Sequence, residues 1–128
     1  MAAHRPASKQ QQAAYPKRGE IYLTALDPTV GSEIKKTRPA LVIQNNTSNR
    51  LTSTTIVAPI TSTVRFPLSP VHALLPADPT TGLSVASVAL LNQIRVVDRQ
   101  RLVKRLGSVD ATTLRQVEAA IKISLDVS

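Results

Sequence analysis

The feature that most limits how this chain can fold is a series of short apolar stretches, each ended by residues typical of turns. The stretches are four to seven residues long and rich in β-branched side chains, and they occupy residues 20–26, 40–44, 54–60, 71–75, 87–91 and 94–97. Such lengths and compositions predict strands. Only the segment from residue 110 or 111 to 125 has a helical pattern, with apolar side chains at Leu114, Val117, Ile121 and Leu125.

Strands this short must close up or be covered, because exposed strand edges favour aggregation. We therefore expect a mainly β (α+β) fold, a small and strongly bent barrel with one C-terminal helix. The length of 128 residues favours a single domain. Residues 1–16 contain a glutamine run, two prolines and few large apolar side chains. This composition predicts a disordered basic tail, followed by one domain over residues 17–128.

The charge of the chain indicates a polyanionic partner. The formal net charge is +8 and the isoelectric point is about 10.7, which favours binding to nucleic acid, an anionic membrane or an acidic protein. The absence of cysteine excludes disulfides and thiolate sites. With only His4 and His72 and no cluster of carboxylates, we expect neither a metal site nor a cofactor. No membrane-spanning run and no signal peptide is present, so we expect a cytoplasmic protein.

The polar stretch at residues 31–39 (GSEIKKTRP) is the most distinctive local feature. It holds one carboxylate, three cations and two hydroxyls and leads directly into the apolar run 40–44. Pro39 restricts Arg38 to extended backbone. We therefore predict a loop that ends at the foot of a buried strand, with Arg38 on its most rigid part. A cationic loop of this kind suits the binding and polarisation of a phosphodiester.

Other segments carry weaker predictions. Residues 45–50 (NNTSNR) read as a second polar loop, and Pro59 predicts that its strand bends or becomes an edge strand. Residues 98–105 contain four cations and one acid. We interpret this segment as a solvated basic face, with a specific RNA contact as the alternative.

A set of short motifs, in order along the chain, resembles the MazF/PemK toxins of bacterial type II toxin–antitoxin systems. The motifs lie at residues 18–22 (RGEIY), 26–28 (LDP), 31–33 (GSE), 37–39 (TRP), 57–61 (VAPIT), 90–95 (LLNQIR), 98–102 (DRQRL) and 123–125 (ISL). Each motif is weak alone, but the ordered set is specific. The resemblance covers about residues 17–127.

The resemblance implies an SH3-like, CcdB/PemK plasmid-maintenance-toxin barrel that forms a two-fold homodimer. It also implies metal-independent, sequence-specific cleavage of single-stranded RNA, which leaves 2′,3′-cyclic phosphate and 5′-hydroxyl ends and inhibits growth. The implied partner is a cognate MazE-like antitoxin, whose acidic C-terminal segment occupies the RNA site.

Three residues are candidates for catalysis. Arg38 matches the family's catalytic arginine, and Thr61 matches its catalytic threonine. A guanidinium stays charged and grips two phosphoryl oxygens, so Arg38 suits charge stabilisation rather than proton transfer. Glu33 matches a loop glutamate of the family and is the nearby acid that can act as a base. The structural alternatives are a salt bridge for Arg38, a strand-end cap for Thr61 and an ion pair for Glu33.

The proton donor and acceptor stay open, since Thr37 stands where some family members have a histidine before the arginine. His72 matches a strand position of the family and is expected to pack in or beside the core. The remaining candidates are expected to bind RNA, the lysines through phosphates and the amides through base edges. They are Ser32, Lys35, Lys36, Asn45, Arg50, Ser62 and Gln93.

Two other functions remain open at this point. The first is a CcdB-like poison of DNA gyrase, which binds without catalysis. The second is a basic barrel that binds RNA without cutting it. The Arg38-Pro39 pair and Thr61 favour the ribonuclease over both.

Overall fold

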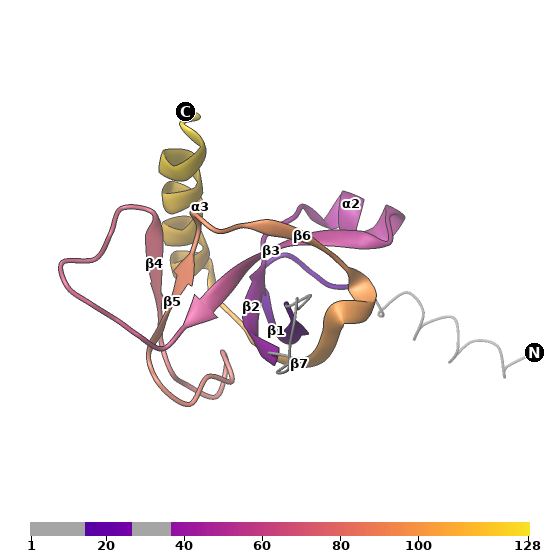
Figure 1. Cartoon of the computed structure of the whole chain (residues 1–128), viewed down its shortest axis with the longest axis horizontal. Helices are drawn as coiled ribbons and strands as arrows, with labels where there is room; N and C mark the ends of the chain where they lie inside the picture. The colour runs from indigo at the N-terminus through magenta and orange to yellow at the C-terminus, as the bar shows by residue number, and fades with distance from the viewer. Residues whose placement is uncertain (1–14, 27–36) are drawn as a thin grey trace, which may run out of the picture.

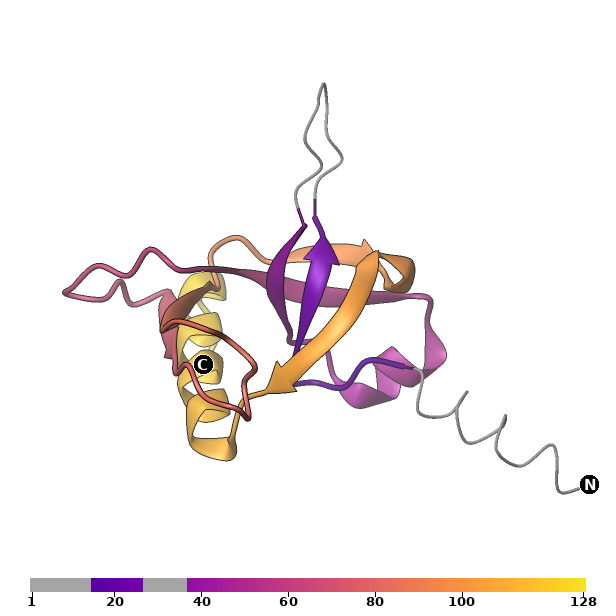
Figure 2. The same cartoon turned by 90° about the horizontal axis from the view of Figure 1, so that it is seen from below.

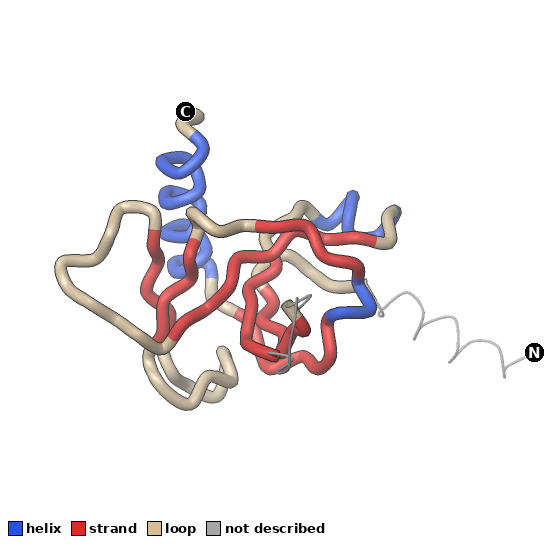
Figure 3. The backbone as a smooth tube through the Cα atoms, viewed as in Figure 1, coloured by secondary structure: helices blue, strands red, loops and turns tan. Residues whose placement is uncertain are grey.

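The computed structural model describes residues 15–26 and 37–128 of the chain. The described residues form seven strands and a long C-terminal helix (Figure 1). The strands are β1 (Glu20–Ala25), β2 (Thr37–Val42), β3 (Thr54–Thr61), β4 (His72–Leu75), β5 (Ser87–Leu90), β6 (Arg95–Asp98) and β7 (Leu102–Ser108). The helices are α2 (Asn46–Leu51), the short 3₁₀ helix η1 (Arg99–Arg101) and α3 (Ala111–Leu125). Figure 3 shows the strands in red, joined by tan loops, with the long C-terminal helix in blue.

The strands form one antiparallel sheet in the order β4-β5-β3-β2-β1-β7, with β6 paired to β3 outside this order. Among the described strands, β4 and β7 lie at opposite ends and no pairing joins them, so the sheet is not closed. The predicted mainly β architecture with a C-terminal helix is confirmed. The predicted disorder of residues 1–14 lies outside the described residues, whereas Pro16, the last residue that we assigned to the tail, is buried against the domain.

Strand β3 connects the two halves of the molecule. Its first half pairs with β6, from Thr54 opposite Asp98 to Val57 opposite Arg95. Its last two residues, Ile60 and Thr61, pair with β5. Pro59 lies between these two pairings and is itself opposite Ala40 of β2. At the proline where we predicted a bend, the strand paired to one edge of β3 therefore changes from β6 to β5.

Two apolar clusters fill the two sides of the sheet. The larger cluster lies between the sheet and α3 and includes Ile21, Leu41, Ile60, Leu75, Leu91 and Val117. The smaller cluster fills the bend formed by β1, β2, β3 and β6, with Leu26, Ala40, Val42, Val57 and Val97. Figure 2 shows α3 beside β4 and β5, with β1, β2 and β7 grouped at the other side. The centre of the sheet is therefore buried on both faces.

Helix α3 begins as the sequence predicts. The carboxylate of Asp110 accepts a hydrogen bond from the Thr113 backbone N–H at 2.8 Å, and this bond lowers the pKa of Asp110. Buried Thr113, Val117 and Ala120 face the core, whereas Leu125, which we assigned to the apolar stripe, is exposed. A salt bridge of 2.6 Å from Arg18 to Glu118 ties the start of the fold to this helix.

Strand β2 begins at Thr37 rather than at Ala40, so Arg38 lies within the strand and not at the end of a loop. Two further segments differ from the prediction. Residues 46–51 form α2 rather than a loop, because Asn45 caps the helix through its bond from the Ser48 backbone N–H. The buried amide of Asn49 anchors that helix to Gln44 and Thr55, with distances of 2.6–2.9 Å.

The basic segment at residues 98–105 is not only a solvated face. Residues 102–108 form β7, which pairs with β1 along its length. Arg101 donates to the Ala25 carbonyl at 3.0 Å, and Arg105 forms a 2.8 Å salt bridge with Glu20. Lys104 remains exposed. The arginines of this segment therefore serve partly to hold β7 in place.

Candidate active site

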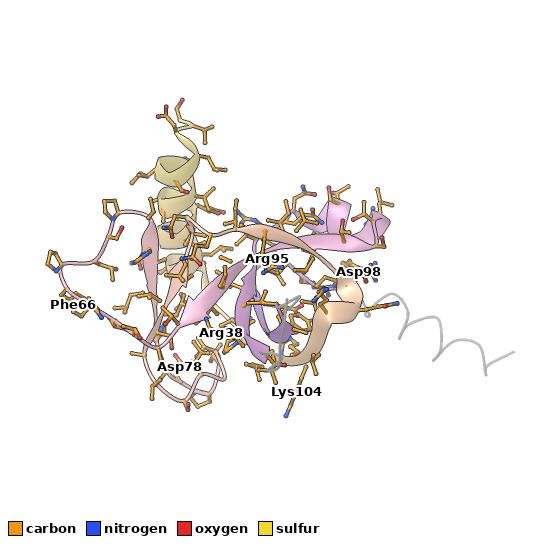
Figure 4. All side chains as sticks on the ribbon, viewed as in Figure 1. Arg38, Phe66, Asp78, Arg95, Asp98 and Lys104 are labelled. Carbon is orange, nitrogen blue, oxygen red and sulfur yellow. The ribbon has the colours of Figure 1, made fainter. Side chains whose placement is uncertain are left out.

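A pocket of about 410 Å³ opens where the start of β2 meets the end of β3. Two groups of residues line it on these strands, Thr37, Arg38 and Pro39 from β2 and Ile60, Thr61 and Ser62 at the end of β3. The rest of its lining comes from the β4–β5 loop, the start of β5 and Leu106 of β7. Figure 4 shows Arg38 beside the end of β3. Strands β2, β3 and β5 meet here because β3 pairs with β2 along one edge and with β5 along the other.

Arg38 is held by its strand while its side chain remains exposed. Its backbone lies opposite Thr24 of β1, and Pro39 follows it within β2. Within residues 15–26 and 37–128, no carboxylate forms a salt bridge with Arg38. Arg38 is also the only charged residue that lines the pocket in this part of the chain. A guanidinium in this setting can accept an anionic ligand from solvent.

Thr61 is the last residue of β3 and lies opposite Val88 of β5. Its hydroxyl oxygen accepts a hydrogen bond from the Thr63 backbone N–H at 3.1 Å. This bond is the strand-end cap that the sequence left as the structural alternative. Because the oxygen already accepts a bond, its own proton remains available for donation into the pocket. Capping and donation to a phosphate are therefore compatible.

Sequence reasoning placed ten residues in the site, and the structure brings three of them together. Arg38, Thr61 and Ser62 line the same pocket. Asn45 and Arg50 belong to the cap and body of α2, and Gln93 lies in the turn before β6; none of them lines this pocket. The predictions for Ser32, Glu33, Lys35 and Lys36 lie outside the described residues.

His72 has a neighbourhood that the sequence did not reveal. It is partly exposed on β4 and lines a second pocket of about 340 Å³ together with Thr61, Arg65 and Val88. We expected His72 to pack in or beside the core. Thr61 lines both pockets and therefore forms part of the wall between them.

Sequence reasoning also missed the part of the first pocket that the β4–β5 loop forms. Gly82, Leu83, Ser84 and Val85 of this loop line the pocket, as do Ser87 and Leu106. The only sequence signal was a cluster of turn residues at 76–82, which indicates a loop but not what the loop contacts.

A polar cluster outside both pockets supports β1. The hydroxyl of Tyr22 donates to Glu20 Oε1 at 3.1 Å, while Arg105 Nε donates to Glu20 Oε2 at 2.8 Å. Burial, followed by the negative charge of Glu20, raises the pKa of Tyr22 to about 12. The Tyr22 hydroxyl therefore stays protonated in the folded protein at neutral pH.

The described residues hold neither a metal-binding cluster nor a membrane-spanning helix. Within the described ranges, no three His, Cys, Asp or Glu side chains lie close enough together to hold a metal ion. In the same residues, no helix is both long and apolar enough to cross a membrane.

Comparisons with known proteins agree with this architecture. The chain is 42% identical over 109 residues to the endoribonuclease EndoA of Bacillus subtilis, which covers 85% of this chain and 93% of that protein. Its fold matches a MazE–MazF structure from Deinococcus radiodurans with a TM-score of 0.74 and 29% identity, over 89% and 98% of the two chains. A mycobacterial endoribonuclease bound to its cognate antitoxin gives a TM-score of 0.71 with 25% identity, over 88% and 97% of the chains.

The family model for the PemK-like, MazF-like toxins of type II toxin–antitoxin systems matches residues 17–125. This range includes both strands that supply Arg38 and Thr61. With most of its length matched and a relative at 42% identity, the chain belongs to the PemK-like, MazF-like toxin family.

Proposed function

We propose that this toxin is a metal-independent endoribonuclease that cuts single-stranded RNA at specific short sequences. The observation that carries the proposal is the meeting of Arg38 and Thr61 in one pocket. The family membership and the name of the Bacillus subtilis relative, an endoribonuclease, support the same activity. The net charge of +8 suits a polyanionic substrate.

The reaction uses the substrate's own ribose as nucleophile. The 2′-oxygen forms a bond to phosphorus as the bond from phosphorus to the 5′-oxygen breaks, which yields a 2′,3′-cyclic phosphate and a 5′-hydroxyl. Arg38 stabilises the charge that develops on the phosphoryl oxygens, and the Thr61 hydroxyl donates to one of them. Glu33 is the proposed base that takes the 2′-hydroxyl proton. An acid must also protonate the departing 5′-oxygen.

An RNA with more than one phosphodiester linkage extends beyond this pocket. Ser62 is proposed to contact the same phosphate as Thr61, since both residues line the pocket. We propose that the flanking nucleotides are bound by the remaining residues that the sequence analysis assigned to RNA binding. They are Ser32, Lys35, Lys36, Asn45, Arg50 and Gln93.

The proposed partners follow from the family. The toxin is expected to act as a homodimer and to be neutralised by a cognate MazE-like antitoxin. The relatives crystallised with MazE or with a cognate antitoxin support this pairing. We further propose that residues 17–128 carry the activity and that the protein acts in the cytoplasm on messenger RNA.

Incubation of the purified protein with a mixed-sequence RNA in EDTA tests the function directly. We expect cleavage at a short recurring sequence, with 5′-hydroxyl and cyclic phosphate ends. Arg38→Ala and Thr61→Ala should each remove most of the cleavage without unfolding the protein. The control is Thr112→Ala, because Thr112 is an exposed threonine of α3 that does not line the pocket.

The alternatives give different results in the same assay. Uncut RNA together with inhibited gyrase supercoiling would identify a gyrase poison. Uncut RNA that is retained by the protein would identify a binding barrel without catalysis. Full cleavage by the Arg38→Ala/Thr61→Ala double variant would reject the proposed site.

A further inference from the structure

The pocket lined by Arg38 and Thr61 has another part of its wall that carries no charged side chain. Residues 82–85 of the β4–β5 loop form this wall, and its side chains are those of Leu83, Ser84 and Val85. Such a surface has no cation for a phosphate. It suits the uncharged parts of a nucleotide, the base and the ribose.

Hydrogen bonds hold the loop behind this wall in one conformation. Thr81 is only 2% exposed, and its hydroxyl donates to the Pro76 carbonyl at 2.7 Å. Its backbone N–H donates to the Asp78 carboxylate at 2.8 Å. The Thr80 carbonyl accepts a bond from the Ser108 backbone N–H at 2.9 Å, which joins the loop to the end of β7.

Two glycines allow the loop backbone to lie directly on the β7 backbone. A Cβ atom added to Gly82 would overlap the carbonyl oxygen of Leu106, and one added to Gly107 would overlap that of Thr80. Gly82 also has a φ of +73°, which side chains disfavour. Leu83, next along the chain, is buried in the main core. The wall is thus preorganised before any ligand arrives.

Val85 stands out on this rigid surface. Its side chain is 52% exposed at the pocket, although burial of an aliphatic side chain is favourable. Its carbonyl accepts a hydrogen bond from the Ser87 hydroxyl at 2.9 Å, which fixes its backbone. An exposed valine that lines the same pocket as Arg38, the proposed phosphate ligand, is suited to cover an apolar surface of the RNA.

We propose that Val85 packs against the base of the nucleotide that directly adjoins the cleaved linkage, and that this contact helps to determine the cleavage sequence. The inference rests on the proposed ribonuclease function and adds a specificity-determining residue to it. The chain has one Phe, two Tyr and no Trp, so aromatic stacking on bases is scarce. An aliphatic side chain can provide the apolar contact that aromatic residues provide in other RNA-binding sites.

The test compares cleavage maps of three variants on an RNA library with randomised sequence. Val85→Thr keeps the shape of the side chain but replaces a methyl group with a hydroxyl. Val85→Tyr adds a surface for stacking. Val103→Thr is the matched control, because Val103 is also an exposed valine, at 61%, but does not line the pocket. The 5′ ends of the products give the sequence preference at each position around the cut.

We expect Val85→Thr to weaken the preference at one of the two positions that flank the cut by about tenfold, the size of effect that one methyl contact produces in a binding pocket. Val85→Tyr should change the preferred base at that same position. The other positions, and the map of Val103→Thr, should match those of the wild type. Unchanged maps for both Val85 variants would overturn the proposal, as would an equal change in the control.

A second measurement separates this proposal from the proposed function. RNA retained from the same library by Thr61→Ala protein, with and without Val85→Thr, is sequenced without any need for cleavage. If wild-type protein cuts no RNA, the ribonuclease proposal fails. A change in the retained sequences would still support the contact at Val85, and identical retained sequences would reject it.

Discussion

At the scale of single residues, the hydroxyl of Thr61 shows how a backbone contact prepares a side chain for chemistry. The Thr63 backbone N–H donates to the Thr61 oxygen, so the hydroxyl proton is directed elsewhere. Thr61→Ser should retain most of the activity because it keeps the hydroxyl. Thr61→Val should lower kcat about 10²–10³-fold, the usual loss when one donor to a transition-state oxyanion is removed.

Single-turnover cleavage and thermal unfolding of both variants check this prediction. The melting temperatures should remain close to that of the wild type. Equal activity of Thr61→Val and Thr61→Ser would mean that the hydroxyl has no part in the reaction.

The second prediction at this scale concerns Tyr22, whose pKa is raised to about 12 by burial and by Glu20. An unfolded tyrosine ionises near pH 10. The contribution of Tyr22 to stability is therefore complete below pH 10 and is lost as the pH rises from 10 through 12. Denaturant unfolding between pH 9 and 11.5 should show a steeper decline in the free energy of unfolding for wild type than for Tyr22→Phe. Parallel declines would contradict the assignment, because the remaining titrating groups are common to both proteins.

At the residue scale, the predictions for Arg38 and Thr61 came from motifs that match the family. The structure places both residues in the lining of one pocket, and their catalytic roles stay predictions. The place of Val85 in the pocket could not be predicted, because it depends on β7, which lies about twenty residues further along the chain. The RNA contact predicted for Asn45 stays a prediction, and the structure adds a role that the sequence did not show, since the side-chain oxygen of Asn45 caps α2.

At the scale of elements, the packing of the β4–β5 loop against β7 requires glycine at positions 82 and 107, where a side chain would overlap backbone atoms. Gly107→Ala places a methyl group against the backbone of residues 80 and 81, and overpacking of this kind costs about 1–3 kcal/mol. Gly82→Ala adds the strain of a positive φ to a similar overlap, worth about 1 kcal/mol more. We therefore expect Gly82→Ala to be the less stable variant.

Chemical denaturation of the two glycine variants measures this order. Ser84→Ala is the control from the same loop, since Ser84 is exposed and its change should stay within about 0.5 kcal/mol of wild type. If both glycine variants were as stable as Ser84→Ala, the loop would not be packed on β7 as described.

The elements missed by sequence reasoning were those fixed by distant partners. The polar segment 46–51 has little apolar periodicity, and it forms α2 because buried Asn49 bonds to Gln44 and Thr55. Residues 102–108 alternate weakly between apolar and polar side chains, and they form β7 because β1 lies beside them. The strands with continuous apolar runs and the capped C-terminal helix were predicted correctly, because local pattern and burial agree there.

At the scale of the whole molecule, the net charge of +8 should make RNA binding sensitive to salt. Each phosphate contact to a single strand contributes about −0.7 to the slope of log K against log salt. Arg38→Ala should therefore reduce the magnitude of the slope by about 0.7. Arg115→Ala is the matched control, because Arg115 is an exposed arginine of α3 that does not line the pocket. Fluorescence titration with an RNA of fixed sequence at four salt concentrations measures both slopes, and equal changes would exclude a phosphate contact at Arg38.

The overall architecture could be predicted because the strand runs, turn signals and single helix admit few arrangements. The sequence patterns led us to expect a small barrel, but they do not determine whether the two outer strands of the sheet pair with each other. Whether β7 and β4 pair depends on how far the sheet bends, and the described strands leave these two edges apart.

The position of Thr61 between two hollows has a practical consequence for inhibitor design. A fragment seated beside Arg38 and another seated beside His72 would both contact Thr61, which lines the two pockets. Joining them through a short tether makes the second association intramolecular, which strengthens binding by about 10²–10⁴-fold when the tether fits. The threonine thus marks the junction at which two weak ligands are best linked into one.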